Sequence, residues 1–223
     1  MTTALLQTTY FGPIQWYQKL NRYDRVLIEQ WDSYQKQTYR NRCIIATANG
    51  LQALTVPVEH DTLNIKNERL NIKNETLKTK DLRISDHNQW RHVHWNALQS
   101  AYSESPFFEY YTDDIRPFYE EKYEYLIDFN EAIRQKICEL IDLHPHVEYT
   151  TRFLSPQASD IDPLPSPLDD FRDVINAKHP QPDDDFQPKR YWQVFERKHG
   201  FQENLSILDL LFNMGPEAIY FLS

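Results

Sequence analysis

The segment Tyr34–Arg42 has the residue types best suited to binding a negatively charged molecule. It holds three cations, Lys36, Arg40 and Arg42, and no acidic residue, in a chain whose formal net charge is −9. Arginine offers a planar fork that matches phosphate or carboxylate, and lysine adds a point charge. If the backbone here is extended, the three cations share one face with Tyr34 and Thr38. The segment therefore predicts a site for an anionic substrate.

A second interpretation of these cations is open from the sequence alone. The chain has acidic residues that could pair with them inside the protein, namely Glu29, Asp32, Asp113 and Asp114. Cations paired in this way would stabilise the fold and would not bind a substrate.

His94 is the best single candidate for acid–base chemistry. It lies in the middle of an apolar stripe on a predicted helix, and an imidazole in such an environment can be tuned to titrate near neutral pH. The alternative is a core histidine that donates to a backbone carbonyl. His92 faces another side of the same helix, so the two histidines cannot chelate a metal from it. The stripe consists of Trp90, Ala97, Leu98 and Ala101.

Several other kinds of site are not supported by the sequence. The four glycines are far apart, so a glycine-rich phosphate loop is absent, as is a Gly-x-Ser-x-Gly nucleophile motif. Cys43 and Cys138 are flanked by apolar residues and are interpreted as buried small hydrophobes. With no Cys-x-x-Cys pair, we expect no metal site. The sequence does not identify a cofactor or an oligomeric state.

Composition limits the class of protein. A chain of 223 residues with 40% hydrophobic residues can bury a core and predicts one domain, or at most two. It has no apolar run of about 18 residues, so no membrane span is expected. The first residues lack the features of a signal peptide, and we therefore expect a cytoplasmic protein. The negative net charge argues against non-specific binding of nucleic acid.

The hydrophobic pattern predicts an α/β fold. Apolar runs predict short strands in the first half of the chain, and the Asn49-Gly50 pair between two of them is a hairpin signal. Helical spacing follows in the second half. We expect a single domain over residues 1–223, with a mixed sheet from the N-terminal half and a strand at 146–150. Helices at about 13–21, 88–103 and 126–143 and a C-terminal helical tail would flank the sheet.

Two segments depart from this pattern. Residues 60–80 contain a tandem repeat, in which 63–69 and 70–76 are identical in six of seven places. Two copies are too few for a solenoid, so we interpret 60–80 as an expanded polar loop. Residues 154–188 are rich in proline and aspartate and predict a long connection with only short ordered pieces.

Six short blocks follow one another along the chain: Lys36 with Tyr39–Arg42, Thr55–Val58, Asp81–Ile84, Trp90 with His94-Trp95, Tyr102 with Pro106–Phe108, and Asn204–Asn213. This series resembles the WbqC-like family of surface-polysaccharide loci. Taken in order, the blocks cover most of the chain. The chain departs from the family pattern at Thr8, where proline is common, and a family carboxylate ahead of the lysine matches either Glu29 or Asp32.

The resemblance implies a role in the biosynthesis of O-antigen or capsule-type sugars. Combined with the cationic segment, it suggests an enzyme that transfers a group to or from a sugar or nucleotide-sugar derivative. In this hypothesis Lys36, Arg40 and Arg42, with Tyr34 beside them, hold an anionic moiety. The predicted catalytic residues are His94, as general base, and Tyr39, which orients the substrate together with Asn41.

Two other functions compete with this hypothesis. The absence of a recognised catalytic motif and the long proline-rich connection fit a non-catalytic binding or scaffold protein of a polysaccharide assembly system. A metal-dependent hydrolase is the weakest interpretation, because it depends only on scattered histidines and on acids such as Asp113-Asp114.

Overall fold

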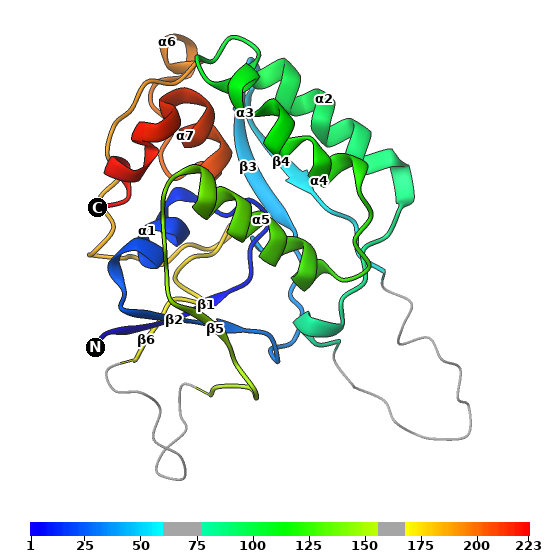
Figure 1. The fold of residues 1–223 in the computed structure, drawn as a ribbon, viewed down its shortest axis with the longest axis vertical. Coiled ribbons are helices and arrows are strands. Elements are labelled where there is room, and N and C mark those ends of the chain that lie inside the picture. Colours follow the sequence, from blue (N-terminus) through cyan, green and yellow to red (C-terminus); the bar gives the residue numbers. More distant parts are fainter. Residues whose placement is uncertain (60–76, 156–167) are drawn as a thin grey trace.

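The computed structural model describes residues 1–59, 77–155 and 168–223, which form a single α/β domain (Figure 1). Its main sheet has four parallel strands in the order β5-β2-β1-β6. The predicted α/β class is therefore confirmed. The four strands are β1 (Thr3–Gln7), β2 (Arg25–Glu29), β5 (Val147–Tyr149) and β6 (Leu168–Asp170).

The sheet is built on two apolar strands joined by one helix. All five residues of β1 are buried, as are four of the five in β2, which is the pattern of parallel strands covered on both faces. Helix α1 (Ile14–Arg22) follows Pro13 and connects the two strands, with Trp16 and Leu20 buried. Because the strands are parallel, their carboxyl ends all lie at one edge of the sheet.

The predicted hairpin forms a second sheet of its own. Strands β3 (Arg42–Thr47) and β4 (Gly50–Thr55) pair antiparallel around a turn at Ala48-Asn49. We expected the hairpin to belong to one mixed sheet with β1 and β2. It instead packs against helices α2 (Trp90–Tyr102) and α7 (Ile207–Met214), as Figure 1 shows, and those contacts take the place of strand pairing with the main sheet.

The long predicted helices are present, and shorter ones lie between them. Helix α5 (Leu126–Leu140) lies within the predicted range 126–143 and crosses in front of the molecule in Figure 1. The aromatic-rich stretch before it, for which no helix was predicted, folds into α3 (Phe108–Ile115) and α4 (Pro117–Glu120). The remaining helical elements are η2 (Thr79–Asp81), η3 (His87–Gln89), α6 (Glu196–His199) and η4 (Gly215–Phe221).

The C-terminal tail packs back onto the core, as expected. Gly215 ends α7 at φ 56°, a conformation that side chains rarely adopt, and a Cβ there would lie 2.6 Å from the Phe107 ring. Ala218 and Leu222 beyond it are fully buried. The tail therefore belongs to the same domain.

The two irregular segments are described only in part. The tandem repeat at 63–76 lies outside the described residues. The 154–188 connection contains β6 at the edge of the main sheet, which the sequence did not predict, because three residues among prolines give no strand signal. Phe171 and Ile175, just after β6, are buried, so this part of the connection contributes to the core.

Candidate functional site

The cationic segment Tyr34–Arg42 turns through space instead of running straight. Turns and bends occupy 36–41, and Gln37 has a positive φ of 62°. The expected alignment of the three cations on one extended face is therefore wrong. Lys36 is exposed at the surface, Arg40 is buried, and Arg42 is partly buried at the start of β3.

Arg40 is paired with an acid in the protein interior. Its Nη2 bonds Asp32, and the two side chains are 5% and 10% exposed. Asp32 also accepts from the Thr79 hydroxyl, and the Thr79 amide donates to the Asp32 carbonyl at 3.0 Å. This is the internal pairing that the sequence left open. It ties the segment to η2.

The other residues predicted for the substrate site are engaged with the backbone or with the core. Arg42 Nε donates to Thr55 Oγ1 at 3.0 Å, and the Asn41 amide donates to the Val56 carbonyl at 2.8 Å. Tyr39 is 8% exposed, and burial raises its pKa to about 12. Burial also raises the pKa of the half-buried Tyr34. Substrate contact by these side chains and by Lys36 stays a prediction.

A second buried ionic centre lies at the carboxyl ends of the parallel strands. Glu29, at the end of β2, is fully buried, and its carboxylate accepts from Thr150 Oγ1 at 2.9 Å and from Arg172 Nη1 at 3.2 Å. Arg172 also donates to Asp170, at the end of β6, at 2.6 Å. The Leu154 amide donates to Glu29 as well, at 2.9 Å. The centre thus joins the ends of β2, β5 and β6, and no sequence pattern had pointed to Arg172.

Further buried polar atoms at this edge have no partner among the described residues. They are Gln7 Oε1, Thr9 Oγ1, Arg40 Nε and Asn130 Oδ1. Ligands of parallel α/β sheets usually bind beyond the carboxyl ends of the strands. Here, however, the unpaired atoms lie below the surface of the described part of the chain, so by themselves they do not make an open site.

His94 is a fully bonded core histidine. It is 4% exposed, its Nδ1 lies 2.9 Å from the Tyr10 hydroxyl, and the ring also bonds the backbone of Thr55. Burial lowers its pKa to about 4, so the ring is neutral at pH 7 and Nδ1 accepts from Tyr10. The Tyr10 hydroxyl in turn lies 2.9 Å from that of Tyr119. These contacts match the alternative open from the sequence, and a general-base role for His94 stays a prediction.

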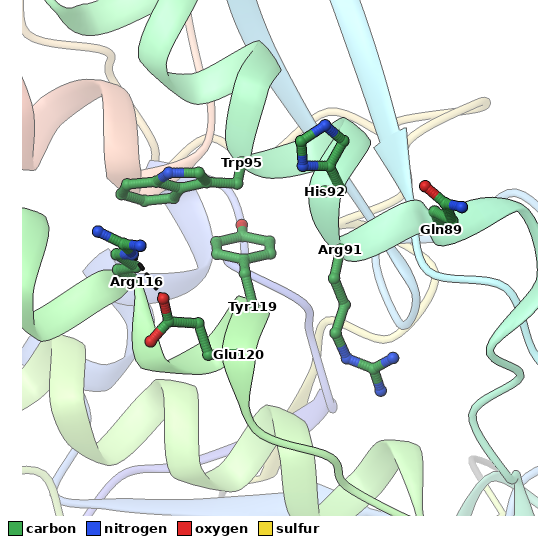
Figure 2. A pocket seen from close by; sticks show the side chains of 7 residues that line it. All are labelled: Gln89, Arg91, His92, Trp95, Arg116, Tyr119 and Glu120. Atoms are coloured by element: carbon green, nitrogen blue, oxygen red, sulfur yellow. Dashed lines mark hydrogen bonds and ion pairs between the residues drawn. The ribbon is translucent and has the colours of Figure 1, made fainter.

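An open cleft of about 480 Å³ lies between α2 and α4, in the size range of small-molecule sites. Figure 2 shows the Trp95 and Tyr119 rings next to each other, with Arg116 and Glu120 on one side and His92, Arg91 and Gln89 on the other. The ring centroids of Trp95 and Tyr119 are 5.8 Å apart. The cleft is lined by Gln89, Arg91, His92, Trp95, Arg116, Tyr119 and Glu120.

The guanidinium groups of the cleft are held in place by neighbouring side chains. Arg91 bonds Asp86 and lies 4.6 Å over the Trp90 ring. Arg116 bonds Glu120 at 2.6 Å, one helical turn on. Two of the residues that line the cleft are arginines, and each of them is paired with a carboxylate, Asp86 or Glu120. The cleft can therefore accept a ring against its aromatic wall and a negative group at its rim.

The whole cleft lies within the part of the chain that matches a known family. The model of the WbqC-like protein family matches residues 7–166, which is most of the chain. The chain belongs to the WbqC-like protein family. A curated relative, the uncharacterized protein Rv1507c of Mycobacterium tuberculosis, is 26% identical over 235 residues, covering 96% of this chain and 94% of the relative. No solved structure matches the chain significantly.

The sequence of this WbqC-like protein indicates helix α2, which forms one wall of the cleft, but it does not indicate the cleft itself. The Trp90…His94-Trp95 block lies on α2, but nothing in the sequence pattern places Tyr119 beside Trp95. The signal that could have found it is the four-residue spacing of Arg91 and Trp95, which places them on one helix face.

The described part of the WbqC-like chain offers no candidate metal site, membrane-spanning helix or activated cysteine. The described residues contain no group of three or more His, Cys, Asp or Glu side chains that could hold a metal ion. Within the same residues, no helix is long and apolar enough to cross a bilayer. Both cysteines are free and buried, and burial raises the pKa of Cys43 and raises that of Cys138 to about 11, so neither is an activated thiol.

Proposed function

We propose that the chain is a cytoplasmic enzyme of surface-polysaccharide biosynthesis that transfers a group to or from a sugar or nucleotide-sugar derivative. In this proposal the α2–α4 cleft holds the sugar. One observation carries it: within the family-matched region, a single open cleft combines the Trp95 and Tyr119 rings with the guanidinium groups of Arg91 and Arg116.

The lining of the cleft fits the chemistry of a sugar with an anionic substituent. A sugar ring has an apolar face that packs on an aromatic side chain, and its polar edge requires donors and acceptors around that platform. Trp95 and Tyr119 supply the platform. His92 and Gln89 supply polar groups, while the planar fork of Arg116 suits a phosphate or carboxylate on the sugar. The anionic group is thus held by cleft arginines in place of the buried Arg40.

His94 acts in this proposal as a positioning residue. Neutral His94 accepts from Tyr10, and Tyr10 is bonded to Tyr119, whose ring lines the cleft. The chain of three side chains fixes the aromatic wall without exposing the imidazole. Lys36 and Arg42, nearer the surface than Arg40, remain candidates for contact with the rest of an extended substrate.

Binding of defined sugars tests the proposal directly. A panel of hexose 1-phosphates, uronic acids and nucleotide sugars is screened by thermal shift, and compounds that bind are incubated with the protein and followed by mass spectrometry. We expect a sugar bearing a negative group to raise the melting temperature and to be converted. Trp95→Ala and Arg116→Gln should weaken binding, whereas Tyr110→Ala, which replaces an exposed aromatic outside the cleft, should not.

The proposal fails if Trp95→Ala and Arg116→Gln, shown to be folded by circular dichroism, bind and convert the sugar as the wild type does. A panel in which no sugar binds the wild-type protein also contradicts it. Comparison of His94→Gln with Trp95→Ala separates the roles, since a positioning residue changes affinity through Tyr119 and leaves the pH profile of turnover unchanged.

A non-catalytic sugar-binding protein is the second candidate. It is favoured by one observation: the single carboxylate that lines the cleft, Glu120, is ion-paired with Arg116 and is exposed to water. This arrangement binds a polar ligand but does not resemble a buried acid or base prepared for proton transfer. Tight binding without conversion of any sugar of the panel would decide for this candidate.

A further inference from the structure

The segment 190–194, outside the family-matched region, presents a tryptophan to solvent. Buried and outward-facing positions alternate along it: Tyr191 and Gln193 are 5% and 3% exposed, whereas Trp192 between them is 49% exposed. Alternation of this kind is expected where successive side chains point to opposite sides. Arg190 is exposed, and Val194, in the turn that follows, is partly exposed.

A buried carboxylate fixes this segment from below. Asp209 on α7 is 1% exposed and accepts from the Tyr191 hydroxyl at 2.6 Å and from the Gln193 amide at 3.2 Å. The Gln193 amide also donates to the Gln202 carbonyl at 2.8 Å. Because both neighbours of Trp192 are anchored in the core, the outward position of its indole is set by the fold.

The outward side chains enclose a hollow of about 640 Å³, again in the range of small-molecule sites. Glu196 bonds Arg190 through Nε at 2.8 Å, which fixes the orientation of that guanidinium. The hollow is lined by Arg190, Trp192, Gln193, Val194, Glu196 and Arg197.

The charge around the hollow is opposite to that of the chain. Residues 189–198 hold four cations and one acid, a local formal charge of +3 in a chain of −9. Lys189 and Lys198 are tied to backbone carbonyls, at 3.0 Å to Tyr220 and 2.6 Å to Ala48. The charged groups that line the hollow are therefore the two arginines and Glu196.

We propose that this hollow binds a nucleoside diphosphate, with the base or sugar stacked on Trp192 and the phosphates held by Arg197 and Arg190. An indole face accepts any flat ring, and a guanidinium fork pairs with phosphate oxygens. The site is concave and has one exposed ring between two arginines, which fits a small molecule. Binding to a membrane would require a surface that projects outward. The site is separate from the α2–α4 cleft and does not depend on the function proposed for it.

Calorimetric titration with UDP tests this site, with uridine and inorganic pyrophosphate as probes that lack one half of the ligand. We expect UDP to bind more tightly than either probe. Trp192→Ala should weaken UDP binding at least about fivefold, in line with the loss of one stacked ring. Arg197→Gln should also weaken it, and more strongly at low salt. The matched controls are Tyr220→Ala and Lys178→Gln, which change exposed residues outside the hollow.

Three results would overturn the inference. The first is wild-type protein that does not bind UDP at millimolar concentration. The second is pyrophosphate binding as tightly as UDP with no effect of Trp192→Ala, which would make the site a simple anion site. The third is loss of UDP binding in Trp95→Ala but not in Trp192→Ala, which would place the nucleotide in the other cleft.

Discussion

Replacing His94 with glutamine tests whether the imidazole is buried in its neutral form. Glutamine can still accept from Tyr10 and donate to the backbone of Thr55, but it does not titrate. Burial lowers the His94 pKa from 6.5 to about 4, so the unfolded chain takes up this proton first as the pH falls. The wild-type protein therefore loses stability as the pH falls through 6.5 towards 4. His94→Gln lacks this loss.

The size of the effect follows from the two pKa values. One pKa unit corresponds to about 1.4 kcal/mol, so the full difference is about 3 kcal/mol once the pH is below 4. Between pH 7 and pH 5 the His94 contribution to the free energy of unfolding should fall by about 2 kcal/mol. At pH 7 the variant should be the less stable protein, by about 1–2 kcal/mol, because glutamine packs less well than the imidazole against the surrounding aromatic rings.

Urea unfolding at pH 7, 6 and 5, followed by circular dichroism, measures this difference. Other groups titrate in the same range, so the informative quantity is the wild-type free energy minus that of the variant at each pH. His92→Gln is the matched control, because His92 is exposed on the same helix. This variant should show the same change of unfolding free energy with pH as the wild type. If wild type and His94→Gln lose equal stability between pH 7 and pH 5, the account of His94 as a neutral core residue is refuted.

Three further predictions follow from the packing. Gly12→Ala should destabilise the protein by about 1–3 kcal/mol, because its Cβ would lie 2.4 Å from Thr9 Oγ1, and adding Thr9→Ala should restore part of the loss in thermal unfolding. Gly215→Ala should cost more than about 2 kcal/mol, because strain at φ 56° adds to a clash with Phe107; a melting temperature equal to wild type would contradict this. Burial raises the Asp209 pKa to about 6, so its contribution to stability is present at low pH and is lost as the pH rises from 4 to 7. Asp209→Asn does not titrate, so between pH 4 and pH 7 it should lose about 2 kcal/mol less stability than the wild type does. Urea unfolding of both proteins at pH 4 and pH 7 measures this difference.

The main elements of the fold could be predicted because each depends on a local pattern. The apolar runs of β1 and β2, the Asn49-Gly50 turn and the spacing on α2 and α5 are all visible in short windows of sequence. β6 could not be found in this way. Its three residues are held by pairing with β1, more than 160 positions away, and local propensity says nothing of such a contact.

The candidate site was harder to predict because side chains of the same type take opposite roles. Arg40 and Arg116 each have an aromatic residue within two positions in the sequence, yet Arg40 pairs with buried Asp32 whereas Arg116 lines an open cleft. A turn at Gln37 decides the first of these positions, and the fold of α4 decides the second. Neither can be obtained from composition or spacing.

The loop after β1 connects the carboxyl edge of the main sheet with the wall of the α2–α4 cleft. The Thr8 hydroxyl accepts from Asn130, which also donates to the Arg40 carbonyl, so this end of the loop belongs to the carboxyl edge of the sheet. Two residues on, the Tyr10 amide bonds the Tyr39 carbonyl, and its hydroxyl meets His94 and Tyr119 behind the cleft wall. A short series of hydrogen bonds therefore joins the carboxyl edge of the sheet to the wall of the cleft. Two of the sequence blocks meet here: the block around Arg40 lies behind the cleft, and the block with His94 supports the wall that its own Trp95 lines.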